Sequence, residues 1–272
     1  MKKLKKAFTF FAPVLVLSYI CICGYFYFIQ NTIIFRPSKA DVNDRYSYNF
    51  PFEERWYEPE EGVRIHSIHA FTDLDSARGL VIYHHGNRGN NRTNPAKFEL
   101  FLKAGYNVLY PDYREYGKST GELWDEEDLV GDMNYIFNEM EGEYREEDII
   151  VMGYSLGAGV AAQVAAANDP KMLIMWTPFY SMLDMKDAQF AFLPDFLVRY
   201  PLRVDEALQK IEEPVYIFFA AEDDVLPVTR SYKLTEYLKE GDEAFVLEGQ
   251  GHGWIYRNQE LLRKMEDILS AE

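Results

Sequence analysis

The serine at position 155 lies in a setting that needs an explanation. It stands between two glycines in GYSLG, directly after the apolar run DIIVM and directly before the alanine-rich run AGVAAQVAAA. Glycine inside a strand or helix costs about 0.5–1 kcal/mol relative to alanine, so Gly153, Gly157 and Gly159 must serve a purpose. A G-x-S-x-G pattern between a strand and a helix is typical of a nucleophile elbow, a strained turn that exposes a serine hydroxyl. We therefore predict that Ser155 is a nucleophile and that the glycines let neighbouring backbones approach it.

A nucleophilic serine needs a general base, because its hydroxyl is a weak nucleophile at neutral pH. His252, in EGQGHGW, is the only histidine that follows Ser155 in the chain. It fits the chain order of serine, acid and histidine that accompanies such elbows. The acid is expected after the apolar run VYIFFAA, where Glu222, Asp223 and Asp224 all compete. Spacing alone does not choose among these three carboxylates.

Attack on a carbonyl also requires donors for the oxyanion. The first is expected to be the amide of Leu156, directly after the nucleophile, and the second an amide from the loop in YHHGNRGN. In that loop Gly86 permits a tight turn and Asn87 is the natural donor. The adjacent histidines suggest a metal site as an alternative, but no carboxylate lies near them in sequence. The sequence therefore predicts neither a metal nor a cofactor.

The elements that must position these residues follow from the hydrophobic pattern. Beyond residue 50, short apolar runs such as GLVIYHH, DIIVMGY and VYIFFAA alternate with helical segments. This alternation predicts an α/β fold with a mainly parallel sheet covered by helices on both faces. Residues 178–204 break the rhythm with an aromatic, proline-containing stretch. The pattern fits a short helical lid or insertion over the sheet and an ordinary edge helix with loops equally well.

The N-terminal sequence predicts a membrane anchor. Lys2, Lys3, Lys5 and Lys6 precede residues 7–29, which carry no charge. A helix of that length measures about 35 Å, enough to cross a hydrocarbon core of about 30 Å. A cleaved signal peptide is the alternative, but bulky residues follow the apolar run where small ones are needed. We expect an anchor over 1–30, a linker over 31–50 and a catalytic domain over 51–272, with the lysines cytoplasmic and the domain extracytoplasmic.

Composition excludes other classes of protein. The formal net charge of −16 repels phosphate backbones, so nucleic acid is a poor partner. The two cysteines, Cys21 and Cys23, both lie in the apolar N-terminal run. The globular part therefore has no disulfide framework and no thiolate metal site.

Several motifs together resemble the α/β-hydrolase superfamily, and in particular its membrane-anchored, small-lid serine hydrolases of the α/β-hydrolase domain-containing type. The family's oxyanion loop is matched by HHGNRGN, its D-Y-R-G-Y-G segment by PDYREYGKSTG, and its elbow by GYSLGAGVA. Its S-P-F-x-S segment is matched by TPFYS, its acid loop by DDVLP, and its histidine turn by GQGH. The resemblance implies an eight-stranded sheet, selects Asp223 as the acid and assigns Asn87 as the second oxyanion donor. This sequence departs from the family pattern at two places. Glu115 replaces a glycine that is usual in the family, and we expect it at the rim of the site. FFAAED stands where the family usually has a histidine-glycine pair before the acid.

The resemblance implies a serine hydrolase that cleaves carboxylic ester or thioester bonds through an acyl-enzyme. An apolar lid beside a membrane favours acyl or lipid-like substrates over other small molecules. A serine peptidase or amidase of the same fold is the alternative enzyme. A non-catalytic binding protein is the alternative from another class, since a fold does not dictate a function.

Overall fold

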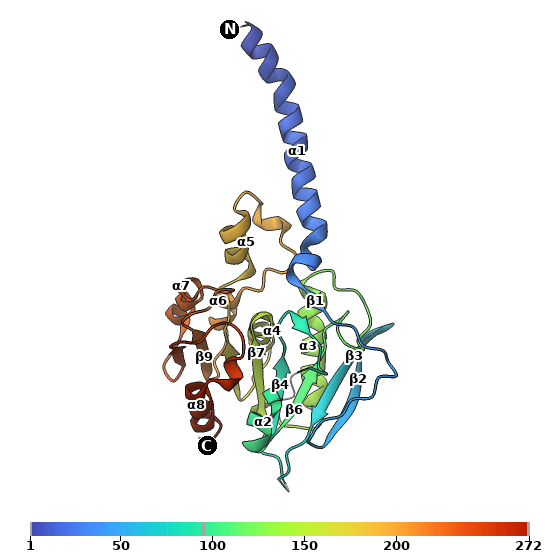
Figure 1. Ribbon diagram of the computed structural model, residues 1–272, viewed down its shortest axis with the longest axis vertical. Helices are drawn as coiled ribbons and strands as arrows, with labels where there is room; N and C mark the ends of the chain where they lie inside the picture. The colour runs from blue at the N-terminus through green and yellow to red at the C-terminus, as the bar shows by residue number, and fades with distance from the viewer. Residues whose placement is uncertain (1, 75, 94–95, 271–272) are drawn as a thin grey trace.

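The computed structural model describes residues 2–74, 76–93 and 96–270, and its centre is one twisted sheet (Figure 1). In this part of the chain eight strands form the sheet in the order β10-β9-β8-β7-β4-β6-β3-β2. Only β3 runs against the others, because it pairs antiparallel with both β2 and β6. The strands are β2 Phe52–Glu60, β3 Val63–Ala70, β4 Gly79–His84, β6 Tyr106–Pro111, β7 Ile149–Tyr154, β8 Met172–Trp176, β9 Val215–Ala220 and β10 Glu243–Leu247.

Helices cover both faces of this sheet, and each face has its own apolar core. One core joins the sheet to α3, α4 and α6, and the other joins it to α2 and α8. Strands β4, β6 and β7 are buried almost throughout, as expected for parallel strands with helices on both sides. The predicted α/β class with a mainly parallel sheet is therefore confirmed. The helices are α2 Ala96–Lys103, α3 Glu126–Met140, α4 Leu156–Ala165, α5 Met182–Phe190, α6 Val204–Leu208, α7 Val228–Ser231 and α8 Gln259–Ser270, with short 3-10 turns η1 Glu146–Asp148, η2 Asp195–Leu197, η3 Tyr232–Tyr237 and η4 Ile255–Arg257.

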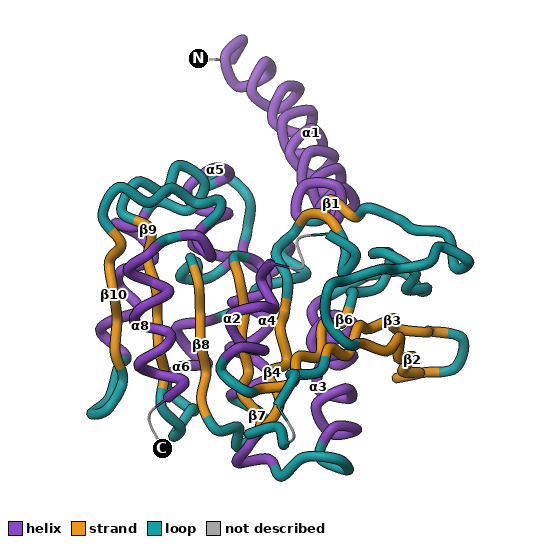
Figure 2. The backbone as a smooth tube through the Cα atoms, turned by 60° about the horizontal axis from the view of Figure 1, so that its bottom comes forward, coloured by secondary structure: helices purple, strands orange, loops and turns teal. Residues whose placement is uncertain are grey.

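The N-terminal helix α1, Lys2–Ile34, projects away from the domain (Figures 1 and 2). Its Phe11–Ile34 part is long and apolar enough to cross a membrane. The predicted lysine cluster lies outside the described side chains, which begin at Phe11.

The stretch expected to be a linker packs onto the domain. The Phe35 side chain is buried and its ring centroid lies 4.9 Å from that of Tyr200. Strand β1, Arg36–Pro37, then pairs with β5, Arg88–Gly89, in a small parallel sheet. The end of α1 is thus fixed to the loop that follows β4, because apolar burial and backbone pairing both hold it there.

The 178–204 segment rises from the carboxyl end of the sheet beside the lower part of α1 (Figure 1). It contains α5 and η2, with Ser181 capping α5 by accepting a hydrogen bond from the Asp184 N–H. The Tyr19 hydroxyl on α1 donates to the Phe192 carbonyl over 2.8 Å, and the rings of Phe26 and Phe190 lie 4.9 Å apart. The segment therefore packs against α1 as well as against the sheet.

The connection from β6 to α3 holds Glu115 in a left-handed conformation with φ of 68°. The neighbouring Arg114 guanidinium donates to both carboxylate oxygens of Asp132 on α3, over 2.8 and 2.9 Å. The conformation at residue 115 is thus set by its neighbours, although a non-glycine residue pays about 1–2 kcal/mol to adopt it.

Glu115→Gly is expected to raise the free energy of unfolding by about 0.5–1 kcal/mol, because the relief of left-handed strain exceeds the entropy that glycine adds to the unfolded chain. Urea unfolding followed by circular dichroism measures this change. The matched control is Gly117→Ala: Gly117 also has positive φ, but a Cβ there would lie 1.8 Å from the Asp112 carboxylate, so the variant should be strongly destabilised. A destabilised Glu115→Gly would contradict the strain argument.

Candidate active site

Ser155 occupies the sharp turn between β7 and α4. Its backbone angles, φ 55° and ψ −118°, lie in a sparsely populated region, where strain of about 1–3 kcal/mol is typical of functional positions. A Cβ on Gly153 would lie 2.2 Å from the Gly157 carbonyl oxygen, and one on Gly157 would lie 2.1 Å from the His84 carbonyl oxygen. No other residue fits at either position, so the two glycines permit the backbone contacts that form the turn.

His252 and Asp223 meet Ser155 at the carboxyl edge of the sheet. His252 follows β10, and its Nε2 lies 2.9 Å from the Ser155 Oγ. Its Nδ1 lies 2.7 Å from the Oδ2 of Asp223, which follows β9. The other oxygen of Asp223 accepts the N–H groups of Val225 and Leu226 over 2.9 and 2.7 Å. Of the three carboxylates in this loop, it is therefore Asp223 that contacts the imidazole, with its own orientation fixed by the backbone.

The histidine turn is held by groups that the sequence analysis did not single out. The Tyr154 hydroxyl donates to the His252 carbonyl over 3.0 Å. The Gln250 side-chain amide donates to the carbonyls of Gly251 and Gly253 over 2.7 and 2.9 Å. Tyr154 is the residue between Gly153 and Ser155 in the elbow, and that position was the only signal in the sequence that could have identified it.

Leu156 and Asn87 line the same cavity as Ser155. Leu156 begins α4, where a helix leaves its first N–H groups without partners. Asn87 is fixed by its carbonyl, which accepts from the Arg36 N–H over 2.9 Å and from the Tyr116 hydroxyl over 2.8 Å, and by its side chain, which donates to the Ile34 carbonyl. Within the described residues, neither the Leu156 N–H nor the Asn87 N–H donates a hydrogen bond.

Comparison with known proteins bears on the family and the fold. Residues 75–200 match the family described as serine aminopeptidase, S33. The Pyrococcus furiosus esterase Pf2001 superposes with a TM-score of 0.68 over 87% of this chain and 97% of its own, at 20% identity. The chain belongs to the α/β-hydrolase superfamily.

Curated relatives of this α/β-hydrolase come from bacteria, plants and animals. An uncharacterized protein of Mycobacterium tuberculosis is 27% identical over 88% of this chain and 87% of its own length. The α/β hydrolase domain-containing protein WAV2 of Arabidopsis thaliana is 27% identical over 73% and 72%. The lysophosphatidylserine lipase ABHD12 of Gallus gallus is 25% identical over 86% and 72%. The family match and these relatives support a hydrolase.

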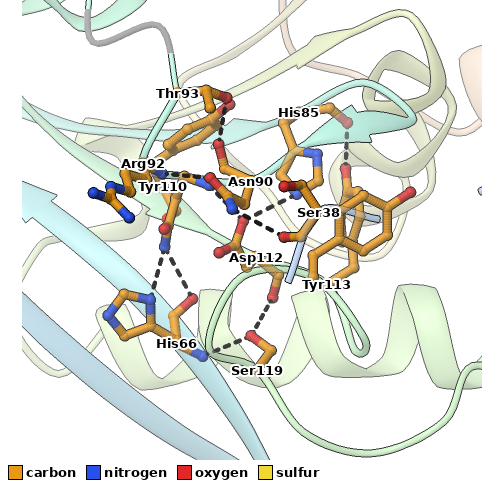
Figure 3. A network of polar contacts seen from close by, with 12 residues as sticks. Ser38, His66, His85, Asn90, Arg92, Thr93, Tyr110, Asp112, Tyr113 and Ser119 are labelled. Carbon is orange, nitrogen blue, oxygen red and sulfur yellow. Dashed lines mark hydrogen bonds and ion pairs between the residues drawn. The ribbon is translucent and has the colours of Figure 1, made fainter. Parts of the chain in front are cut away.

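A buried polar network in the α/β-hydrolase domain supports the loop that carries Asn87 (Figure 3). The Asn91 N–H donates to the Oδ1 of Asp112 over 2.7 Å, and the Tyr113 hydroxyl donates to the His85 carbonyl over 2.8 Å. The Ser119 hydroxyl donates to the Asp112 carbonyl and accepts from the His66 N–H. Because these groups are buried, losing one partner leaves another polar group unsatisfied, so the network holds the loop in one conformation.

The two adjacent histidines lie inside this part of the fold. A carboxylate does approach them, although none is near in sequence: the Nε2 of His85 lies 3.5 Å from the Oδ1 of Asp112. Burial lowers the pKa of both His84 and His85 to about 3 and raises the pKa of Asp112 well above its usual range. Both imidazoles are therefore uncharged near neutral pH, and the contact of His85 with Asp112 is not an ion pair. Across the described residues, no three histidine, cysteine, aspartate or glutamate side chains are placed to hold a metal ion.

Ser155 and His252 open into a cavity of about 700 Å³. Its lining includes Gly86, Asn87 and Leu156, and the half-buried Lys97, whose pKa burial lowers to about 8. Its other walls are mainly apolar side chains of α1 and of the 178–204 segment, Phe26, Ile33, Ile34, Phe179, Met182, Met185, Phe190, Leu193 and Leu197. Glu115, expected at the rim, is not one of the lining residues, because it lies on the β6–α3 connection.

Replacing His84 by leucine should flatten the acid limb of the stability curve. At ordinary pKa values the unfolded chain binds a proton at His84 below about pH 6.5, whereas the folded chain does so only near pH 3, so the folded state loses stability as the pH falls. Between about pH 6 and 4 the slope of the free energy of unfolding is expected to be smaller by about 1.4 kcal/mol per pH unit in His84→Leu than in the wild type. Urea unfolding across this range measures the difference, and identical slopes would contradict the buried neutral state.

Proposed function

We propose that the protein is a membrane-anchored serine hydrolase that cleaves carboxylic ester or thioester bonds of acyl substrates. The observation that carries this proposal is the continuous chain of contacts from Asp223 through His252 to Ser155, the last two of which line a largely apolar cavity. The esterase and lipase named among the similar proteins support the same reaction class.

In the proposed reaction Ser155 Oγ attacks the carbonyl carbon while the Nε2 of His252 takes its proton. Asp223 accepts the Nδ1–H, which fixes the tautomer and stabilises the imidazolium that forms. The amides of Leu156 and Asn87 stabilise the oxyanion. The protonated His252 then gives its proton to the leaving alcohol or thiol, and the acyl group stays on Ser155. Water attacks this acyl-enzyme with His252 as base, releasing the carboxylic acid and regenerating the serine.

The walls of the cavity favour an acyl chain as the bound group. Side chains of α1, α5 and the turn after α5 supply a largely apolar surface to the cavity that Ser155 and His252 line. Burial of each methylene of an acyl chain contributes about 0.8 kcal/mol in such surroundings. In this proposal the 178–204 segment acts as a lid, and no metal or cofactor takes part.

Membrane anchoring through α1 belongs to the same proposal. The helix has the required length and hydropathy over Phe11–Ile34, and four lysines precede the apolar run. The lysines favour a cytoplasmic N-terminus, which places the catalytic domain on the opposite side.

A peptidase is the second candidate, because the matching family is described as an aminopeptidase. An aminopeptidase needs an anionic group for the substrate ammonium, and Asp224 is the acidic side chain that lines this cavity. Amino-acid p-nitroanilides tested beside p-nitrophenyl esters separate the two activities.

The nucleophile is tested on the full chain in detergent micelles, because α1 contributes to the cavity. A fluorophosphonate probe is expected to label the wild type and the exposed-surface control Ser270→Ala equally, and Ser155→Ala not at all, as read by mass spectrometry. p-Nitrophenyl butyrate turnover should follow the labelling. A folded wild type that neither labels nor turns over substrate would favour the non-catalytic binding protein.

The acid is tested by two neighbouring substitutions. Asp223→Asn should lower kcat by about 10³–10⁴-fold, because an amide no longer holds the productive tautomer of His252. Glu222→Gln is the matched control and should leave kcat within twofold of the wild type, since Glu222 is exposed and its backbone alone bonds to Gln250. Equal losses in both variants would contradict the assignment of Asp223.

A further inference from the structure

We propose that α1 forms one wall of the acyl-binding cavity and that the acyl substrate reaches Ser155 from the bilayer, between α1 and the 178–204 segment. This inference rests on the proposed function and goes beyond anchoring. An anchor that only tethers the domain has no reason to contact the reacting centre. Here, by contrast, Phe26, Gln30 and Ile33 line the same cavity as Ser155 and His252.

The contact between α1 and the 178–204 segment is specific in its polar groups. The side chain of Gln30 donates to the Leu197 carbonyl over 2.7 Å and accepts from the Arg199 N–H over 3.0 Å. The Oδ1 of the next residue, Asn31, accepts from the Arg199 guanidinium over 2.7 Å and from the Tyr200 hydroxyl over 2.9 Å. Two polar side chains at the end of an apolar helix thus bond to the segment that lines the cavity, and the Asn31 amide also donates to the Leu123 carbonyl.

Apolar contacts extend the contact between α1 and the 178–204 segment toward the N-terminus of α1. The ring of Phe26 packs on Phe190 at 4.9 Å and on Phe192 at 5.8 Å. The Tyr19 hydroxyl reaches the Phe192 carbonyl over 2.8 Å. The segment therefore follows α1 from Asn31 to Tyr19, which is about 12 residues or about 18 Å of helix.

The proposed route also requires that the membrane extends to the contact between α1 and the 178–204 segment. A span that starts after Lys6 needs about 20 residues to cross a core of about 30 Å, so it ends near residue 26. Tyr19 lies about 10 Å inside that boundary, and the Phe192 backbone that it contacts lies at the same level. Phe192 and Phe196 expose 51% and 83% of their surface, which costs little if acyl chains surround them.

Charged groups on the segment are compatible with a shallow insertion. The Lys186 ammonium, which lines the cavity, contacts the carboxylates of Asp187 and Asp195 and donates to the Leu193 carbonyl. Two exposed carboxylates paired with one ammonium suit the headgroup level, where charges remain hydrated. We infer that the tip of the segment enters the outer edge of the hydrocarbon and that the cavity below it opens to lipid.

The test compares two phenylalanines on α1. Phe26 is half-buried and lines the cavity, whereas Phe28 is 68% exposed and does not. In the full chain reconstituted in phosphatidylcholine vesicles, Phe26→Ala is expected to lower kcat/KM for p-nitrophenyl palmitate at least tenfold relative to p-nitrophenyl butyrate. Phe26→Leu should recover most of that ratio, and Phe28→Ala should leave it unchanged. A purely structural role for Phe26 would lower both rates together, and that outcome, like an unchanged ratio, would overturn the proposal.

The proposed route from the bilayer is tested by supplying the substrate either in the enzyme's own vesicles or in separate ones. p-Nitrophenyl palmitate in the same vesicles as the enzyme should be hydrolysed at least tenfold faster, in the initial rate, than the same amount supplied in separate vesicles. Butyrate ester, dissolved in water, serves as the control for enzyme content. Equal initial rates for the two palmitate arms would mean that substrate arrives through water and would overturn the route. Failure of the proposed function is distinguishable, because then Ser155 does not label and the butyrate ester is not cleaved.

Discussion

The close approach of two backbones at Gly157 is the constraint on which the candidate site depends. The first turn of α4 lies so near the end of β4 that a single methyl group would overlap the His84 carbonyl oxygen at 2.1 Å. This contact places the elbow, with Ser155 and the Leu156 amide, directly beside the loop that follows β4. The buried polar network around Asp112 supports the same loop, so its position beside the elbow is fixed from both sides.

The parallel sheet brings the remaining groups to the same edge. β7, β9 and β10 all end at this edge, so the turns after them carry Ser155, Asp223 and His252 into contact although they are far apart in the chain. The backbone bonds on the second Asp223 oxygen and the Tyr154 bond to the His252 carbonyl fix the two partners from behind. A strained elbow and a rigid supporting shell are what a preorganised nucleophile requires.

The N-terminal helix changes how the domain is delimited. Phe35, β1 and the Gln30–Asn31 pair join α1 to the domain, and Phe26 and Ile33 complete the wall of the cavity. Removal of residues 1–30 would therefore take away part of the cavity along with the apolar helix. The cavity is therefore a joint product of the α/β-hydrolase domain and the end of α1.

The sequence by itself was enough to predict the secondary-structure elements and the types of residue that could react. Periodicity predicted the strands and helices, G-x-S-x-G selected Ser155 as the candidate nucleophile, and the absence of any later histidine but His252 left one candidate base, because these are local patterns or simple counts. Spacing left three carboxylates open, and only the resemblance chose Asp223. The tertiary structure alone decided that Asp112 approaches His85, that Tyr154 and Gln250 hold the histidine turn, that Glu115 lies away from the cavity, and that α1 lines it. These facts depend on contacts between segments distant in the chain, which hydrophobic periodicity and motif spacing do not encode.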